Sequence, residues 1–219
     1  MWKTIYNRDV DEVAWVSLTQ TSSVASWFQT KEAYDFFDGL SSLEAFACGV
    51  ENDGQLKGVV VGYVQKDGGI IKRFFSRRVI VLGGPLLAND ISEDELTLLL
   101  RGLVERVGKK AIFIEFRNFS DYNRWRKTFE KCGFHYQPHY DIHVDTTSME
   151  VVDAHLGKSR KRDIRVSMRD GASVVMHPSL SQVHDYYGIL KTLYETKVKT
   201  PLFPLEFFER LSTLDSAAV

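Results

Sequence analysis

Residues 43–65 read LEAFACGVENDGQLKGVVVGYVQ, and this stretch decides how the first part of the chain folds. Two runs rich in β-branched and aromatic residues flank the sequence Asn52-Asp53-Gly54. Asp-Gly suits a tight hairpin turn, because both central residues of such a turn take positive φ angles. The stretch therefore predicts a β-hairpin with strands over 43–51 and 55–65.

The segments around this hairpin alternate between strand and helix patterns. The run AIFIEF at 111–116 is continuously apolar, as in a strand buried on both faces of a sheet, and Asp67-Gly68-Gly69 predicts another turn. Further strands are predicted over 2–6, 79–82, 134–145 and 172–176. Helices are predicted from capping boxes of Asp9 with Glu12 and Ser92 with Glu95, and over 26–37, 121–132, 147–171, 182–197 and 204–211. This order predicts an α/β (α+β) fold with a mixed sheet flanked by helices, and parallel pairing in its second half.

A basic stretch follows at 156–171, with the sequence LGKSRKRDIRVSMRDG. Read as a helix ended by Gly171, it places four cations on one face, while Ile164 and Met168 fall on another. The four cations are Lys158, Arg162, Arg165 and Arg169. Because guanidinium groups bind phosphate oxygens through two hydrogen bonds, these four residues predict a phosphate-binding face. The alternative is a solvated helix face that happens to be basic.

Composition narrows the class of protein. The net charge of −1 argues against a general nucleic-acid binder, and the N-terminal residues lack the apolar core of a signal peptide. No stretch is long and apolar enough to span a membrane, and two cysteines do not suggest a disulfide framework. A cytoplasmic globular protein is therefore expected.

Residues 123–134, NRWRKTFEKCGF, are similar to the N-x-x-A-x-x-x-Y-E-K-x-G-F segment of GNAT acyltransferases, with Arg126 in place of the usual alanine. The matching residues are Asn123, Phe129, Glu130, Lys131, Gly133 and Phe134. Together with WFQT at 27–30, GGP at 83–85 and the basic run at 158–165, residues 20–211 resemble the FemAB family. That family comprises bacterial aminoacyltransferases that build peptidoglycan bridges, and their acetyltransferase-like relatives.

The resemblance implies two GNAT-like domains in tandem. Residues 1–146 would form the first domain, and 147–219 a helical region and the start of a second one, so we expect a truncated product or part of a longer enzyme. It also implies acyl or aminoacyl transfer to an amine, with acyl-CoA or aminoacyl-tRNA as co-substrate and no tightly bound cofactor. The basic face would lie at the cleft between the domains. An incomplete second domain would expose apolar surface, which predicts self-association through residues after about 180, with a monomer as the alternative.

Two departures qualify this resemblance. The loop GGPLLANDISEDE at 83–95 lacks the glycine spacing of an acyl-CoA pyrophosphate loop, and Asp90, Glu93 and Asp94 would repel a pyrophosphate at the helix start. Phe37 and Ala33 occupy the positions where relatives that bind a nucleotide-linked cell-wall precursor have a lysine and an aromatic residue. The acceptor is therefore expected to differ, for example an amino sugar or a lipid-linked saccharide.

Other catalytic or metal sites receive little support from the sequence. His135, His139 and His143 share one side of a predicted strand, but each would stand about 13 Å from the next, too far for one ion. Cys132 lacks an electropositive setting that would make it a nucleophile, so we interpret it as a small buried residue. We interpret Tyr186, Tyr187 and Tyr194 as packing residues.

Two function classes remain from the sequence. The first is an N-acyl or aminoacyl transferase acting on a cell-wall or saccharide precursor, whose catalytic residues are not identified. Such an enzyme positions its substrates and stabilises an oxyanion without needing a nucleophile of its own. The second is a non-catalytic remnant or interaction module that keeps the anion-binding face. Because the donor loop is absent, we expect the 219-residue chain by itself to show no transferase activity.

Overall fold

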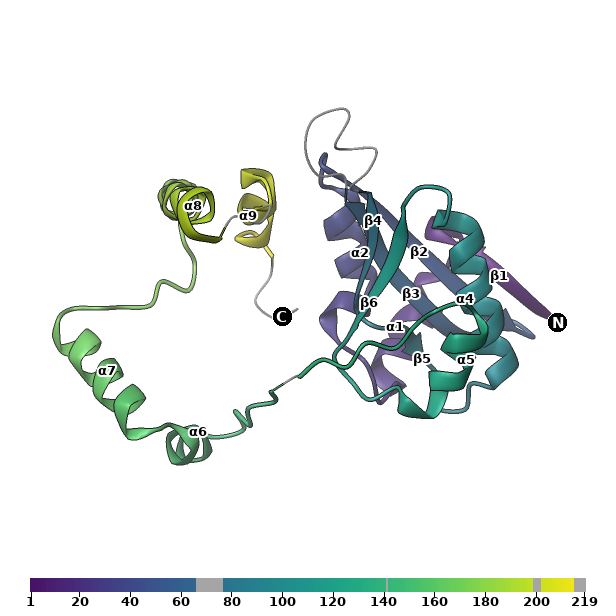
Figure 1. The fold of residues 1–219 in the computed structure, drawn as a ribbon, viewed down its shortest axis with the longest axis horizontal. Helices are drawn as coiled ribbons and strands as arrows, with labels where there is room; N and C mark the ends of the chain where they lie inside the picture. Colours follow the sequence, from purple (N-terminus) through teal and green to yellow (C-terminus); the bar gives the residue numbers. More distant parts are fainter. Residues whose placement is uncertain (66–76, 141, 199–201, 215–219) are drawn as a thin grey trace.

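The computed structural model describes residues 1–65, 77–140, 142–198 and 202–214. It consists of a sheet packed between helices, followed by helices that arc away from that sheet (Figure 1). The turn predicted at 67–69 lies outside the described residues. The α/β class with a mixed sheet flanked by helices is confirmed.

The sheet has six strands, and five of them lie in the order β1-β2-β3-β4-β6. Strands β1 (Trp2–Tyr6), β2 (Leu43–Asn52), β3 (Gln55–Gln65) and β4 (Arg78–Gly83) pair antiparallel in succession. Strand β6 (Phe113–Asn118) pairs parallel with β4, and the short β5 (Leu86–Leu87) pairs with β3. The predicted parallel pairing in the second half is therefore confirmed.

The central hairpin forms as predicted. Asp53 and Gly54 both have positive φ angles, 49° and 79°, and Asn52 pairs directly with Gln55. A two-residue turn of this kind matches the right-handed twist of the strands on either side. Its geometry fixes the register of β2 against β3, the longest pairing in the described sheet.

Alternate residues of the central strands face two separate cores. Helices α1 (Glu12–Thr21) and α2 (Lys31–Asp38) cover one face, where Ala47 and Val61 lie. Helices α4 (Glu93–Val107) and α5 (Arg126–Lys131) cover the other, where Cys48 and Val60 lie. The period of two along each strand thus builds a three-layer domain, and Figure 1 shows the helices on both sides of the sheet.

Three short 3-10 turns complete this domain and adjust two predicted helix starts. They are η1 (Asn7–Asp9), η2 (Trp27–Gln29) and η3 (Asn123–Trp125). The capping box of Asp9 with Glu12 is wrong: α1 is capped by Asp11, whose side chain accepts a hydrogen bond from the Ala14 N–H. The helix predicted over 26–37 is divided between η2 and α2, because the Thr30 side chain caps α2 anew.

A buried glutamine holds the end of β4. The Gln29 side chain is fully buried, and its Nε2 donates to the carbonyls of Gly83 and Gly84, at 3.1 Å each, and to the Tyr122 hydroxyl at 3.3 Å. Its Oε1 accepts from the Ser26 N–H at 2.7 Å. Gly83 and Gly84 both have positive φ angles, which leaves their carbonyls pointing into this network. One side chain therefore joins η2, the end of β4 and the segment before η3.

Beyond residue 146 the described chain contains helices and no strand. They are α6 (Met149–His155), α7 (Lys158–Arg169), α8 (Leu180–Leu193) with its π-helical continuation η4 (Tyr194–Val198), and α9 (Leu205–Leu211). Helix α7 ends as predicted: Gly171 has a φ of 92°, and the Ala172 N–H reaches the Ser167 carbonyl at 2.9 Å. The boundary near 146 and a second GNAT-like domain remain predictions.

The last described helix, α9, packs back onto the sheet domain. The Phe207 ring contacts Phe36 edge-on at a centroid distance of 5.4 Å and stacks on Phe203 at 4.3 Å. Phe203 in turn lies against Tyr63 of β3. These contacts extend the core beneath α2 with residues from the far end of the chain.

Polar contacts fix the same helix against the end of α2. The Ser41 hydroxyl donates to the Glu206 carboxylate at 2.6 Å, and the Ser41 N–H also donates to it. Arg210 donates to the Gly39 carbonyl at 3.1 Å. The hydrogen bonds from Ser41 lower the pKa of Glu206, so this carboxylate stays ionised in its docked position.

Three strand predictions need correction. Residues 134–145 and 172–176 form no strand in the described chain; Phe134 packs against Phe116 and Phe129, but the other apolar side chains are exposed, Tyr140 completely. The run 111–116 does form a strand, shifted to Phe113–Asn118, but it is not buried on both faces or central. Among the described strands β6 lies at an edge of the sheet, and Phe113 is 51% exposed. Because 134–145 forms no strand, no described strand pairs with the outer edge of β6.

Candidate functional site

The predicted basic face lies on a helix that is open to solvent. Every residue of α7 is exposed except the half-buried Lys161, which pairs with Asp153 at 2.8 Å. Lys158, Arg162, Arg165 and Arg169 recur at offsets of four, three and four, so all four project from one side of the helix over about 16 Å. The structure therefore brings the four predicted residues together.

The acidic neighbours of this face leave most of its charge available. Arg162 lies 3.7 Å from the Asp163 carboxylate and Arg169 3.1 Å from that of Asp170, and both contacts are at the surface. Exposed pairs of this kind are weak and exchange readily with other partners. The Arg165 Nε donates only to the Lys161 carbonyl of the same helix. The face is thus a strip of solvated cations on an open surface, and Figure 1 places α7 away from the sheet.

The start of α4 shows why the loop before it is a poor pyrophosphate site. The Ser92 hydroxyl accepts from the Glu95 N–H at 3.2 Å, and the Glu95 carboxylate accepts from the Ser92 N–H at 2.8 Å. The helix begins with three acids, Glu93, Asp94 and Glu95. Side chains of the chain itself therefore occupy two of the N–H groups at this helix start, and the three acids lie at the positive end of the dipole that would bind a phosphate.

Glu95 gives a pH-dependent prediction. Burial raises its pKa, but hydrogen bonds from the backbone and side chain of Ser92 and from Asn52 outweigh burial and lower it overall. A lowered folded-state pKa stabilises the protein above the unfolded pKa, and this contribution is lost as the pH falls through the folded value. Glu95→Gln should lower the free energy of unfolding by about 1 kcal/mol at about pH 7, because the new glutamine amide would face the donating amide of Asn52. The difference in free energy of unfolding between this variant and the unmodified protein, measured by urea denaturation, should become smaller at about pH 4. A constant difference across this range would contradict the account.

Several residues that were considered above as possible functional residues have packing surroundings in the structure. Ala33 and Phe37 are both buried in the core under α2, so neither faces a ligand at the surface. Burial raises the pKa of the Cys132 thiol, which opposes a nucleophilic role. Tyr186 and Tyr187 both contact the Phe208 ring, as packing residues do. Within the described ranges no group of three metal-binding side chains is placed to hold an ion.

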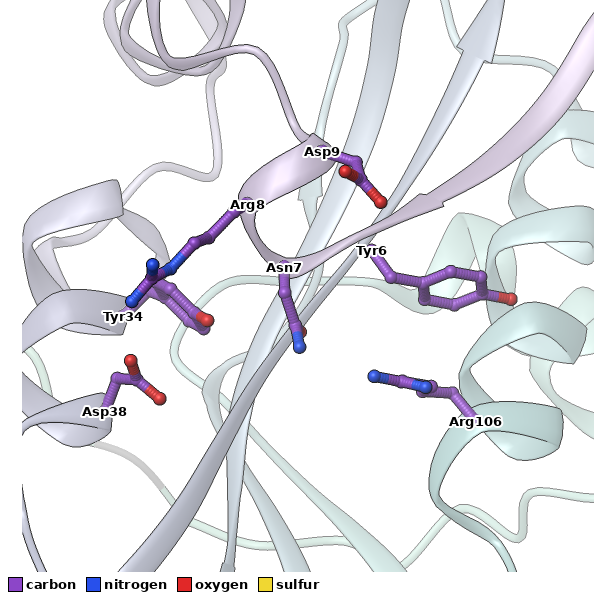
Figure 2. A pocket seen from close by; sticks show the side chains of 7 residues that line it. All are labelled: Tyr6, Asn7, Arg8, Asp9, Tyr34, Asp38 and Arg106. Carbon is purple, nitrogen blue, oxygen red and sulfur yellow. The ribbon is translucent and has the colours of Figure 1, made fainter.

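A pocket that the sequence did not predict lies where β1 ends at the edge of the sheet. Its volume is about 500 Å³, within the range of small-molecule sites. Figure 2 shows α2 on one side, α4 on the other, and the turn η1 between them. The lining residues are Tyr6, Asn7, Arg8, Asp9, Tyr34, Asp38 and Arg106.

Asn7 explains why the chain opens at this point. Its φ is 53°, and its side-chain oxygen accepts from the Ala47 N–H at 3.0 Å, one residue beyond the last β1–β2 pair, Tyr6 with Cys48. The side chain thus replaces the next backbone partner of β2, while the left-handed turn directs the chain away from the sheet. Arg8 and Asp9 follow directly and line the pocket.

Arg106 reaches the pocket from the last turn of α4. Its guanidinium lies 5.5 Å from the centroid of the Tyr6 ring, an orientation that favours the cation over the ring face. Tyr34 and Asp38, one turn apart on α2, line the opposite side. The local sequence signal for this site was Tyr-Asn-Arg-Asp at residues 6–9, because the remaining lining residues, Tyr34, Asp38 and Arg106, are distant in sequence.

A smaller hollow of about 380 Å³ lies between α2 and α9. It is lined by Glu32, Asp35, Phe36, Arg210, Thr213 and Leu214. Its charged residues are engaged elsewhere: Glu32 accepts from the Trp27 indole, Asp35 pairs with Lys31, and Arg210 holds the Gly39 carbonyl. We therefore interpret this hollow as part of the packing of α9.

Comparison with known proteins places the fold. No family model matches the sequence, and no curated protein matches it. Among solved structures, FemX is 12% identical, with 95% of this chain and 54% of FemX covered and a TM-score of 0.57. The chain thus has the fold of about half of FemX.

Smaller acetyltransferases match about two thirds of this chain at lower scores. A ribosomal-protein-alanine N-acetyltransferase from Brucella melitensis biovar Abortus 2308 is 15% identical, covering 65% of this chain and 99% of its own, with a TM-score of 0.46. An aminoglycoside N-acetyltransferase in complex with CoA is 10% identical, covering 67% and 95%, with a TM-score of 0.46. None of the helices in the described ranges combines the length and apolar character needed to cross a bilayer.

Proposed function

We propose that this chain forms part of a FemAB-like N-acyl or aminoacyl transferase that acts on an amine of a cell-wall or saccharide precursor. The observation that carries the proposal is the FemX fold, which matches over 95% of the chain and so includes the helices beyond residue 146. The FemAB-like sequence segments support the same assignment.

The basic face of α7 is proposed to bind the phosphate groups of that precursor. Four cations on one side of a helix suit a diphosphate or a longer phosphate-bearing ligand, because each guanidinium offers paired N–H donors. Acyl-CoA or aminoacyl-tRNA would supply the activated carbonyl; the acceptor amine would attack it directly, the thioester or ester bond would break, and the CoA thiol or tRNA hydroxyl would leave with the proton that the amine loses. The capped, acidic start of α4 does not suit the pyrophosphate of CoA, so the donor is proposed to bind elsewhere.

The alternative is a non-catalytic module that keeps only the anion-binding face. The start of α4 is the observation that favours it, since side chains occupy the Ser92 and Glu95 N–H groups there and three acids would repel a donor phosphate. Both hypotheses require α7 to bind anions, and only the first makes the chain part of an enzyme that transfers an acyl group.

A two-part experiment on the 219-residue chain tests the proposal. Calorimetric titration with UDP-N-acetylglucosamine measures binding, and a mass-spectrometric assay with acetyl-CoA or alanyl-tRNA and a panel of amines measures transfer. We expect binding and no transfer by this chain alone. Absence of binding to any phosphate-bearing probe would overturn the proposed role of α7. Turnover by a monomer would make the chain an enzyme by itself and direct the search for a donor site to the sheet domain and α7.

The same sample tests self-association. We propose a homodimer formed through the region after residue 180, because Ile189 and other apolar side chains of α8 are exposed. Sedimentation equilibrium over a range of protein concentrations should show a reversible dimer. A monomer at every concentration would contradict this proposal without affecting the assignment to acyl transfer.

A further inference from the structure

The pocket at the end of β1 carries both signs of charge in equal number. Arg8 and Arg106 contribute two guanidinium groups, and Asp9 and Asp38 two carboxylates. Within the described ranges none of these four groups forms an ion pair, although both signs line the same cavity. Arg8 and Asp9 lie on η1, Asp38 on α2 and Arg106 on α4, so charges from three elements face a shared space.

All four charged side chains are exposed, and the fold places them on different sides of the pocket. In Figure 2, Arg8 and Asp38 lie on the side of Tyr34, whereas Arg106 lies beside Tyr6 across the cavity from them. Arg106 is positioned by the Tyr6 ring, and Tyr6 by its hydroxyl, which lies 3.4 Å from the Gly102 carbonyl. Asp38 sits in the last turn of α2. Such positioning by separate elements lowers the ordering cost when a ligand binds.

Neutral donors and acceptors lie between the charges. The Tyr34 side chain is buried apart from its access to the pocket, and its hydroxyl has no hydrogen-bond partner among the described residues. Burial raises the pKa of Tyr34, Asp38 raises it further, and Arg8 and Arg106 oppose them, so charges from three elements converge on this hydroxyl. Asn7 uses its side-chain oxygen on the Ala47 N–H, which leaves its amide hydrogens for a ligand.

The balance of charge selects a class of ligand. A simple anion bound by the arginines would meet the repulsion of Asp9 and Asp38, and a simple cation the repulsion of Arg8 and Arg106. A molecule that carries a carboxylate and an ammonium group can form a charge-assisted hydrogen bond with each kind of side chain. From this juxtaposition we infer that the pocket binds a small zwitterion, of the class of free amino acids and short peptides. This site is separate from α7, which contributes no residue to it.

Titration with a dipeptide and its blocked derivatives tests the inference. The probes are glycyl-L-alanine, N-acetyl-glycyl-L-alanine, which lacks the ammonium group, and glycyl-L-alanine amide, which lacks the carboxylate. Binding is followed by calorimetry or by NMR shifts of the Tyr34 and Arg106 backbone amides. We expect the free dipeptide to bind at least about tenfold more tightly than either derivative, the ratio that the loss of one charge-assisted hydrogen bond produces.

Two double variants test which side chains bind the carboxylate and which bind the ammonium group of the dipeptide. Arg8→Gln with Arg106→Gln should weaken binding of the free dipeptide at least about tenfold. In this variant the amidated dipeptide should bind as well as the free one. Asp9→Asn with Asp38→Asn should also weaken binding of the free dipeptide at least about tenfold. In this variant the acetylated dipeptide should bind as well as the free one. Lys109→Gln with Asp185→Asn, which neutralises one exposed cation and one exposed acid outside the pocket, is the control for neutralising surface charges and should bind like the unmodified protein.

Several results would overturn the inference. Equal binding of the free and acetylated dipeptides would make the pocket an anion site, and equal binding of the free and amidated ones a cation site. No binding of any probe up to about 10 mM, in a protein whose melting curve is unchanged, would exclude a zwitterion site of useful affinity. Binding that survives both double variants would place the dipeptide elsewhere on the molecule.

Discussion

Replacing Arg162 and Arg165 with glutamate is expected to lower the affinity for a nucleotide-sugar at least about 100-fold, because each reversal converts an attractive contact with phosphate into a repulsive one. The melting temperature should change by less than about 1 °C, since both side chains are exposed on a helix without packing contacts at these positions. Calorimetric titration with UDP-N-acetylglucosamine and a thermal unfolding curve on the same samples measure the two effects.

A variant with the same change in net charge distinguishes binding by the predicted face of α7 from attraction by the overall charge of the protein. Arg160 lies on the opposite side of α7, and Lys127 is exposed on α5. Reversing both to glutamate changes the net charge by the same amount and should leave the affinity within about threefold of the original. Equal losses in the two variants would show long-range attraction only. No loss in either would return α7 to a solvated basic helix.

Replacing Gln29 with leucine is expected to reduce the free energy of unfolding by about 2–4 kcal/mol. The substitution keeps similar bulk but removes the amide that donates to Gly83, Gly84 and Tyr122 and accepts from Ser26. Buried groups left without partners lose their hydration without compensation, at about 1–3 kcal/mol each in unrelaxed sites. Urea denaturation followed by far-UV circular dichroism measures the change.

Gln20→Leu, on the exposed side of α1, is the control for this variant and should change stability by less than about 0.5 kcal/mol. If Gln29→Leu also cost less than about 0.5 kcal/mol, the network would not be what holds the end of β4. Loss of protection from hydrogen exchange at residues 83–85 before global unfolding would support the proposed role directly.

Local signals predicted the parts of the fold that local interactions determine. The Asp53-Gly54 turn specified its hairpin because few residue pairs adopt its φ angles without strain. Ser92 with Glu95 specified the start of α4, and Gly171 the end of α7, since each supplies hydrogen bonds or a backbone conformation at a defined position. The four cations of α7 followed from helical periodicity once the helix was placed.

Strand predictions failed where pairing, not pattern, decides the structure. Residues 134–145 contain the aromatic and β-branched side chains of a strand, yet a strand exists only if a neighbour completes its hydrogen bonds. For the same reason the apolar run at 111–116 suggested a central strand but lies at an edge. The residue types of a segment show whether it could form a buried strand, but they do not show which strand lies beside it.

The pocket at the end of β1 was beyond local sequence analysis. Tyr6 and Arg106 lie on different elements, and only the packing of α4 against the sheet brings them together. Asn7 carried a usable signal, because asparagine after a strand tolerates the left-handed conformation and can replace a backbone partner. The matching residues on α2 were interpretable only as one side of an amphipathic helix.

The return of α9 to the sheet domain has a consequence for the basic helix. Through Phe207 and Glu206 the chain is anchored at a second point, so α7 belongs to a loop held at both ends and not to a free tail. Anchoring limits the volume that α7 explores and raises its effective concentration beside the sheet domain. A ligand held by the sheet domain at one end would therefore meet the cations of α7 as an intramolecular encounter, whose probability depends on the loop and not on the protein concentration.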